Sequence, residues 1–287
     1  MTNVCLPPDP HPAPPSFALP ANATDCHMHL FGTAPDYPYV AERDYTPSPA
    51  GVEAARAMYK TFGIGRVVVV QPSVYGDDNR CQLEFGAQLG LPFRAVIVPP
   101  HDCTEHDMRD FHDKGVRGIR YILAHPGGLD LAGLERAADS ASERGWHLEF
   151  LLKPHQLLEL APRLAKLRCP VSFDHLAFMK VDEGVEQPAF QALLALLRDG
   201  NSWVKLSGAY RVSGTAGRYQ AVLPLARTIM QTRPDRVVWG SDWPHVGQMV
   251  EMPRTTPLLD LLQDWVPDEG QRNRVLVENP AELYGFA

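Results

Sequence analysis

The sequence lacks several features that would place the protein outside the ordinary globular enzymes. It has no apolar run close to the roughly 18 residues of a membrane-spanning helix, so we expect no membrane partner. Lys and Arg number 27 against 34 Asp and Glu, and the net charge of -7 argues against a nucleic-acid partner. The N-terminal segment has neither the basic nor the apolar region typical of a signal peptide.

Cysteines are few and follow no pattern. None forms a CxxC pair, and the five are Cys5, Cys26, Cys81, Cys103 and Cys169. An odd, unpatterned set is typical of reduced thiols, so we expect a cytoplasmic protein. No GxGxxG or GxxxxGK[ST] motif follows an expected strand, which removes support for a nucleotide-binding sheet.

Eight strand patterns follow a proline-rich start. The prolines of residues 1–23 favour an extended N-terminal arm on the surface. Several of the later segments are near-continuous apolar runs, typical of strands covered on both faces, and helical patterns lie between them. This alternation predicts an α/β fold, a single (β/α)₈ TIM barrel over residues 24–287, with an open doubly wound sheet as the alternative. The expected strands are Thr24–Leu30, Arg66–Gln71, Phe93–Val98, Val116–Tyr121, His147–Leu152, Pro170–Asp174, Ser202–Leu206 and Arg236–Gly240.

Histidines gather at the expected strand ends. In a parallel barrel the carboxyl ends of the strands share one rim, where active sites are built. Imidazole binds metals, polarises carbonyl groups and transfers protons near neutral pH, so several on one rim predict a catalytic site. Seven of the eleven histidines lie at or just after a strand: His27, His29, His101, His125, His155, His175 and His245.

The first strand ends in Asp25-Cys-His27-Met-His29. Strict alternation would point Asp25, His27 and His29 to one face, toward the barrel interior. Two adjacent imidazoles suit a divalent metal or the polarisation of a carbonyl oxygen. His175 closes the sixth strand and Asp242 the eighth. A carboxylate after an apolar strand costs free energy unless it has partners or a catalytic task, so we count Asp242 as catalytic.

Three further polar residues are candidates for substrate contact. Arg120 lies on the fourth strand, and Arg211 follows the seventh. An inward arginine at a barrel mouth can bind a carboxylate through two hydrogen bonds, although a structural ion pair explains it equally well. Ser73 follows the second strand without the G-x-S-x-G turn of a nucleophilic serine, so we assign it to substrate binding.

Seven segments together resemble a known family: DCHMHLFG, PYVAERDYTP, RGIR, DHL, KLSGAYR, WGSDWPH and ENPAELYGF. The set is similar to the amidohydrolase superfamily, in the branch of 2-pyrone-4,6-dicarboxylate lactonase, sugar-acid lactonases and D-galactarolactone isomerase. The resemblance covers nearly the whole chain after the N-terminal arm. The first-strand motif is shared across the superfamily, whereas PYVAERDYTP and SGAYR are more specific to this branch.

The resemblance implies a role for each residue of the site. His27, His29 and His175 would surround a lactone carbonyl, and Asp242 would activate water. The residues that would contact or border the substrate are Tyr45, Ser73, Arg120 and Arg211.

The fourth and fifth strands bear on the metal content. Binuclear members of the superfamily need a bridging ligand from one of these strands. Glu149 and Lys153 are present there, but neither lies in a recognisable motif. We therefore expect no binuclear site and no required cofactor. The alternative is one Zn²⁺ with an open coordination position, held by His27, His29, His175 and Asp242.

The expected activity is that of a carboxylic-ester hydrolase that opens a small, carboxylate-bearing lactone, similar to 2-pyrone-4,6-dicarboxylate or a sugar-acid lactone. Three alternatives stay open. The first is a D-galactarolactone-type isomerase, in which a substrate hydroxyl replaces water. The second is a zinc-dependent non-oxidative decarboxylase, and the third is a non-catalytic binding protein on a retained barrel. The expected partner is a small acidic lactone of aromatic or sugar-acid catabolism, and the chain is also a candidate homo-oligomer.

Overall fold

The computed structural model describes residues 4–126, 128–214 and 217–287. Each of the eight expected strands is present, with ends that differ from the prediction by at most two residues. Each strand pairs in parallel with the next, in the order β1 to β8. The strands are β1 (Thr24–Met28), β2 (Arg66–Val70), β3 (Phe93–Ile97), β4 (Val116–Ile122), β5 (His147–Leu151), β6 (Val171–Phe173), β7 (Ser202–Leu206) and β8 (Val237–Trp239).

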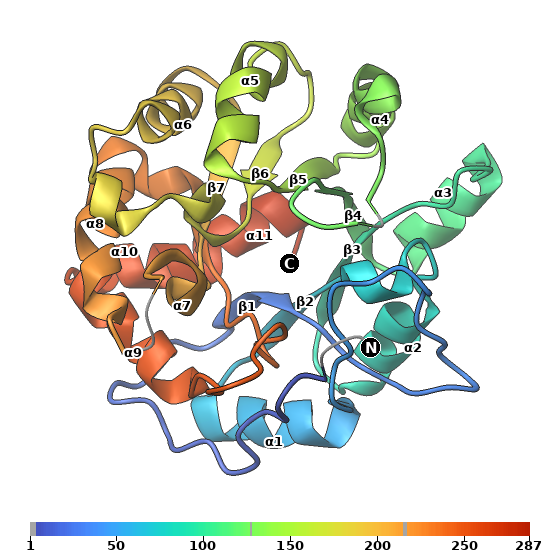
Figure 1. Ribbon diagram of the computed structural model, residues 1–287, viewed down its shortest axis with the longest axis horizontal. Coiled ribbons are helices and arrows are strands. Elements are labelled where there is room, and N and C mark those ends of the chain that lie inside the picture. The colour runs from blue at the N-terminus through green and yellow to red at the C-terminus, as the bar shows by residue number, and fades with distance from the viewer. Residues whose placement is uncertain (1–3, 127, 215–216) are drawn as a thin grey trace.

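The ring of strands closes between β1 and the segment that follows β8. The backbone N–H of Asp242 donates to the carbonyl of His27, and the N–H of His29 donates to the carbonyl of Trp243, both at 2.8 Å. Gly240 permits this close approach, because a Cβ there would lie 2.5 Å from the Cβ of His27. The fold is therefore the predicted barrel and not an open sheet (Figure 1).

Helices surround the strands (Figure 1). Helix α1, for example, presents an apolar face to the barrel with Ala55, Met58, Tyr59 and Phe62. The α-helices are α1 (Val52–Phe62), α2 (Arg80–Gln88), α3 (Glu105–Asp113), α4 (Leu134–Glu143), α5 (Pro154–Leu164), α6 (Pro188–Asp199), α7 (Ala209–Val212), α8 (Leu223–Thr232), α9 (Thr255–Trp265), α10 (Glu269–Asn273) and α11 (Asn279–Tyr284). The shorter turns are η1 (Ser73–Tyr75), η2 (Leu131–Gly133), η3 (His175–Phe178), η4 (Val181–Glu183), η5 (Tyr219–Val222), η6 (Pro234–Arg236) and η7 (Arg274–Glu278).

The amino ends of the strands are closed by α11, which lies across the barrel centre in Figure 1. Arg94 and His147, near the starts of β3 and β5, contact Tyr284 of this helix. The apolar cluster at this end, which we call the barrel plug, consists of Cys26, Val68, Val70, Val96, Trp203, Val238, Leu283, Tyr284 and Phe286. Because the plug fills this end, a ligand site has to lie at the carboxyl ends of the strands.

The N-terminal segment touches loops at the carboxyl ends. The N–H of Cys5 donates to the carbonyl of Thr46, and the N–H of Leu6 donates to the carbonyl of Gln248, at 2.8 and 2.9 Å. Residues 13–16 then run beside α9, where the Thr256 hydroxyl donates to the carbonyl of Ala13. Residues 1–3 of the predicted arm lie outside the described residues. No helix in the described part of the chain is long and apolar enough to cross a membrane.

Candidate active site

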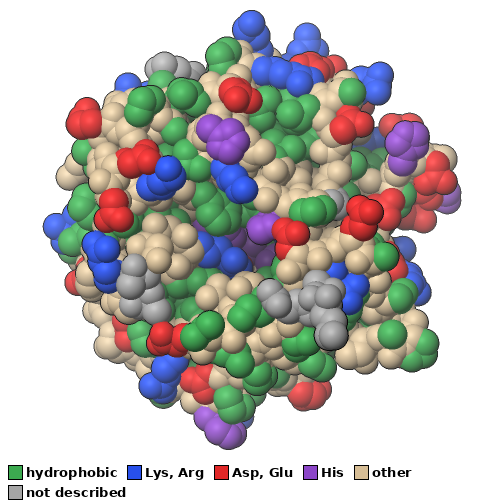
Figure 2. Space-filling view, in the orientation of Figure 1, with side chains coloured by type: hydrophobic (Ala, Val, Ile, Leu, Met, Phe, Trp, Pro, Cys, Tyr) green, Lys and Arg blue, Asp and Glu red, His purple; other side chains and the backbone are tan. Residues whose placement is uncertain are grey.

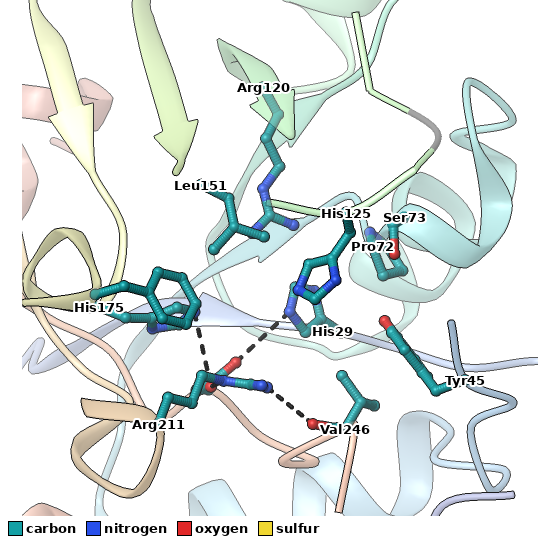
Figure 3. Close-up of a pocket in the computed structure, with 12 residues that line it drawn as sticks. His29, Tyr45, Pro72, Ser73, Arg120, His125, Leu151, His175, Arg211 and Val246 are labelled. Carbon is teal, nitrogen blue, oxygen red and sulfur yellow. Dashed lines mark hydrogen bonds and ion pairs between the residues drawn. The ribbon is translucent and has the colours of Figure 1, made fainter. Parts of the chain in front are cut away.

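A pocket opens at the carboxyl ends of the strands. In Figure 2 it appears as a hollow near the centre of the face, with basic and histidine side chains inside it. Seven of the eight predicted site residues line the pocket, and the eighth, His27, lies directly beneath it. The lining residues are His29, Tyr45, Pro72, Ser73, Arg120, His125, Leu151, His175, Phe178, Arg211, Asp242 and Val246 (Figure 3).

His27 in β1 and His29 directly after it face the site because the strand is irregular. Asp25 pairs with Val67 and Met28 pairs with Val69, so three steps along β1 match two steps along β2. Asp25 is consequently turned toward α1, where the Tyr59 hydroxyl donates to it at 3.1 Å. The prediction that Asp25 shares the face of the histidines was wrong, because strict alternation does not hold across a bulge.

His29 is held in one tautomer by the backbone. Its Nδ1 lies 2.7 Å from the carbonyl oxygen of Val70. A carbonyl only accepts, so Nδ1 carries the hydrogen and Nε2 of the neutral ring is an acceptor. Burial lowers the pKa of His29 to about 3, which keeps the ring neutral near pH 7. The Nε2 acceptor lies 3.7 Å from Oδ1 of Asp242.

Asp242 has one oxygen that is held and one that is free. Oδ2 accepts hydrogen bonds from the Tyr210 hydroxyl and from Nε of Arg211, both at 2.6 Å. Oδ1 is buried without a hydrogen-bond partner. Burial alone would raise the pKa of Asp242, but the charge of Arg211 and the neighbouring histidines together outweigh burial and hold this pKa well below its ordinary value. The carboxyl group is therefore ionised at neutral pH.

The remaining two histidines stand beside the same carboxylate. The Nε2 atoms of His27 and His175 each lie 3.8 Å from an oxygen of Asp242. Nδ1 of His175 lies 2.8 Å from the Ser207 hydroxyl, a group that can donate to it. Burial lowers the pKa of His175 to about 4 and that of His27 well below its ordinary value, so both rings are neutral near pH 7.

The backbone is left-handed where two site residues are placed. From His175 to Phe178 the φ angles run from 50° to 53°, and φ is 59° at Asp242. Non-glycine residues in this region cost on the order of 1–2 kcal/mol each. Gly208 packs against this turn, and a Cβ there would lie 2.8 Å from Nδ1 of His175. The fold accepts this cost at the positions that direct His175 and Asp242 into the pocket.

A buried set of four charges lies beneath the pocket. Nζ of Lys205 lies 2.5 Å from Oε2 of Glu149 and 3.3 Å from Oδ1 of Asp174. Nη2 of Arg120 donates to Oδ2 of Asp174 at 2.9 Å. Nδ1 of His27 is 3.1 Å from both Lys205 and Asp174. Two cations and two carboxylates thus compensate one another, which offsets part of the cost of burying them.

One group of side chains fits a single metal ion. The ligand atoms of His27, His175 and Asp242 all lie within 4.8 Å of one another. Nε2 of His27 and Oδ1 of Asp242 are buried and unpartnered, as ligand atoms of an open tetrahedral site would be. His29, the fourth predicted ligand, is not part of this compact group.

The second group that could hold a metal consists of His27, Glu149 and Asp174. The Lys205 ammonium is already within 3.3 Å of an atom of each of these three residues. A cation of the chain itself therefore occupies this position, which disfavours a second metal ion. Lys153, the other residue considered as a bridging ligand, is exposed at the start of α5.

The residues predicted to contact substrate are also in the pocket. Arg211 donates from Nε to Asp242 and from Nη2 to the carbonyl of Val246, so it also positions the carboxylate. Sequence reasoning did not predict that second role. The hydroxyls of Tyr45 and Ser73 contact each other; burial raises the pKa of Tyr45 to about 12, against the opposing effect of that contact.

Several residues around the site were not predicted. Tyr210 and Lys205 lie in the segment KLSGAYR and Asp174 in DHL, so the motifs contained a signal for them. Among the strand-end histidines, His101 and His155 are exposed and outside the pocket lining. The lining residues with no signal beyond their place after a strand are Pro72, Leu151, Phe178 and Val246.

A parallel barrel with histidines after β1 and β6 and an aspartate after β8 is the arrangement expected of an amidohydrolase-type enzyme. The sequence model of the family described as Amidohydrolase matches residues 24–286. The chain therefore belongs to the amidohydrolase family.

Three relatives place the chain more closely. It is 37% identical to a 4-sulfomuconolactone hydrolase from Hydrogenophaga intermedia, over 98% of this chain and 94% of that protein. It is 32% identical to a D-galactarolactone isomerase from Agrobacterium fabrum, over 94% of this chain and 93% of the other. The structure of a probable 2-pyrone-4,6-dicarboxylic acid hydrolase from Acinetobacter baumannii, with citric acid bound, is similar with a TM-score of 0.82 and 26% identity, covering 92% of this chain and 100% of that one.

Proposed function

We propose that this enzyme hydrolyses a small lactone that carries a carboxylate. The names of its relatives support a lactone as the substrate class. The observation that carries the proposal is the divided carboxylate of Asp242. One oxygen is fixed by Tyr210 and Arg211, and the other is free and faces the histidines.

The free oxygen of Asp242 and Nε2 of His29 form a binding position for the attacking water. Both atoms are acceptors, and they lie 3.7 Å apart. One water molecule can donate a hydrogen to each of them. His29 then orients the water, and Asp242 accepts its proton as the oxygen attacks the ring carbonyl. His29 acts as an acceptor in this scheme, so it does not stabilise the developing oxyanion.

The carbonyl oxygen is polarised by the other two histidines. When the Ser207 hydroxyl donates to Nδ1 of His175, Nε2 of that ring carries a hydrogen and can donate to the oxyanion. When the Lys205 ammonium donates to Nδ1 of His27, Nε2 of His27 becomes a second donor. Neutral imidazole donors suit this role because they need no proton uptake before the reaction.

The substrate carboxylate is held by an arginine of the pocket. Nε of Arg120 is buried and has no hydrogen-bond partner, and Arg211 lines the same cavity. Either guanidinium can give a charge-assisted hydrogen bond that fixes the orientation of the ring. Ser73 and Tyr45 add neutral hydroxyls along the wall.

A metal ion is compatible with the site, but we infer that it is not required. If Zn²⁺ is held by His27, His175 and Asp242, it supplies Lewis-acid polarisation of the carbonyl. The chain's own residues already provide an acceptor pair for water and two donors for the carbonyl oxygen.

A panel of carboxylated lactones tests the proposal, with the products identified by NMR. We expect one ring-opened acid for each lactone consumed: a hydroxy acid from a sugar-acid lactone, and from a pyrone an enol that tautomerises to a keto acid. A ring isomer without opening would instead indicate an isomerase, and release of CO₂ would indicate a decarboxylase. If the folded enzyme converts no member of a panel that includes pyrone and sugar-acid lactones, the proposal is wrong.

A further inference from the structure

The cations in the lower part of the site are already neutralised. Lys205 and Arg120 face Glu149 and Asp174, with contacts of 2.5 Å and 2.9 Å. All four side chains are almost completely buried. This layer therefore presents no net formal charge to a ligand above it.

The upper part of the pocket is balanced in the same way. Arg211 donates to Asp242 at 2.6 Å, and these two are the further charged residues among the lining residues that the structure describes. A substrate with one carboxylate thus brings the site to a formal charge of about -1, and a second anionic group would bring it to about -2. In a largely buried site the second anionic group would lose its hydration without gaining an unpaired cation as a partner.

The mouth of the pocket carries a histidine and a carboxylate. Nδ1 of His125 lies 2.8 Å from Oδ2 of Asp44, and their side chains are 34% and 51% exposed. His125 lines the pocket together with Tyr45 and Ser73 (Figure 3). Because the Asp44 carboxylate only accepts, Nδ1 of His125 donates to it, and Nε2 of a neutral ring is an acceptor.

The charged groups around His125 support the neutral form of its ring. Burial lowers the pKa of His125 and outweighs the opposing effect of the hydrogen bond to Asp44, and the charges of Arg211 and Arg120 also lower this pKa. A neutral His125 offers a lone pair to a substrate hydroxyl. A substrate carboxylate at the same place would meet that lone pair and the negative charge of Asp44.

We propose that the His125–Asp44 pair makes this enzyme select lactones with a single anionic group and a hydroxyl at the end near the pocket mouth. The substrate class is then a hydroxylated monocarboxylate lactone, and dianionic lactones are disfavoured. This inference rests on the proposed lactonase function and narrows it.

Three lactones test the selectivity. The first two, 2-pyrone-6-carboxylate and 2-pyrone-4,6-dicarboxylate, share a ring and differ by one carboxylate. The third, D-glucaro-1,4-lactone, represents the hydroxylated monoacids. In the wild type, kcat/KM should be higher for both monoacids than for the dicarboxylate. His125→Arg and Asp44→Asn should each raise the ratio of dicarboxylate to monocarboxylate kcat/KM by about three- to tenfold, because one adds a cation and the other removes an anion at a half-exposed position.

Glu42→Gln is the matched control, because Glu42 is an exposed acid in the same loop as Asp44 and does not line the pocket. It should leave the ratio unchanged. A wild type that prefers the dicarboxylate, or variants at His125 and Asp44 that leave the ratio unchanged, would overturn the inference while lactone hydrolysis still stands. If the wild type hydrolyses none of the three lactones, the proposed function fails, and calorimetric binding of the same probes then decides the selectivity: the monoacids must bind more tightly than the dicarboxylate.

Discussion

The two ends of the barrel interior are built in opposite ways. At the amino ends of the strands, Val68, Val96 and Trp203 pack against Leu283 of α11 in the apolar barrel plug. At the carboxyl ends the interior holds paired charges and left-handed backbone around Asp242. The comparison shows that the apolar packing of α11 and the candidate catalytic groups lie at opposite ends of the strands.

Replacing Asp242 should give the largest effect on the polar end. Asp242→Asn keeps the shape of the side chain but removes the proton acceptor. We expect kcat to fall by about 10²–10⁴-fold, the range typical of a lost general base. Substrate binding, measured by calorimetry, should persist because Arg120 remains in place.

The melting temperature and the kcat per folded molecule separate this account from a structural role. A structural role predicts a large loss of stability with nearly unchanged turnover. A folded Asp242→Asn enzyme that turns over within a few-fold of the wild type would remove Asp242 from the mechanism.

A substitution in the barrel plug should produce the reverse pattern. Leu283 is buried in α11, so Leu283→Ala should cost about 2–5 kcal/mol in the free energy of unfolding. The kcat of the folded fraction should stay close to that of the wild type, because the plug lies at the opposite end of the strands from Asp242. Denaturant unfolding and steady-state kinetics measure the two quantities.

Leu158→Ala is the control for this substitution, since Leu158 is 47% exposed on α5. It should change stability by no more than about 0.5 kcal/mol. If Leu283→Ala lowered the kcat of the folded fraction as well as the free energy of unfolding, the packing of the plug and the chemistry at the carboxyl ends would not be independent.

Replacing Arg211 should have a smaller effect, which falls on both kcat/KM and the pKa of Asp242. Arg211→Met should lower kcat/KM by the equivalent of about 1.5–3 kcal/mol, because a charge-assisted hydrogen bond is lost. It should also raise the pKa of Asp242, since burial is then no longer opposed by the guanidinium. Activity is lost as pH falls through the pKa of the base, so the acidic limb of the kcat/KM profile should move to higher pH in the variant.

Arg254→Met removes an exposed arginine from the segment after β8 and serves as the control. Its acidic limb should coincide with that of the wild type. An acidic limb that does not move in Arg211→Met would show that Asp242 is not the group that titrates.

The smallest effect is expected from metal removal. Dialysis against a chelator should leave most activity in place, because donors and acceptors for the reaction come from the chain. Turnover and metal content should be measured on the same sample. Loss of turnover that stoichiometric Zn²⁺ restores would contradict this and assign His27, His175 and Asp242 as ligands.

The sequence was informative about the fold and the rim because both depend on short-range patterns. Strand patterns, several of them near-continuous apolar runs, predicted all eight strands, and polar residues at or directly after their ends predicted a common rim around His175 and Asp242. The bulge in β1 was not predictable, because Asp25-Cys-His27 fits strict alternation equally well. The outward turn of Asp25 is therefore visible only in the structure.

Ion pairs and hydrogen bonds between residues far apart in the chain could not be predicted from the sequence either. The pairing of Lys205 with Glu149 joins residues 56 positions apart, and that of Arg211 with Asp242 joins residues 31 apart. Neither pair follows a local spacing rule. The tautomer of His29 likewise depends on the Val70 carbonyl of a neighbouring strand.

Turnover in H₂¹⁸O tests the central claim most directly, which is that Asp242 activates a water molecule for attack on a lactone carbonyl. The best lactone of the panel is converted by the wild type in labelled water, and the product is analysed by mass spectrometry. The account predicts one ¹⁸O atom in the new carboxylate of each ring-opened product, at a rate that falls with kcat in Asp242→Asn. A converted product without ¹⁸O would show that the nucleophile is not water and would contradict the account.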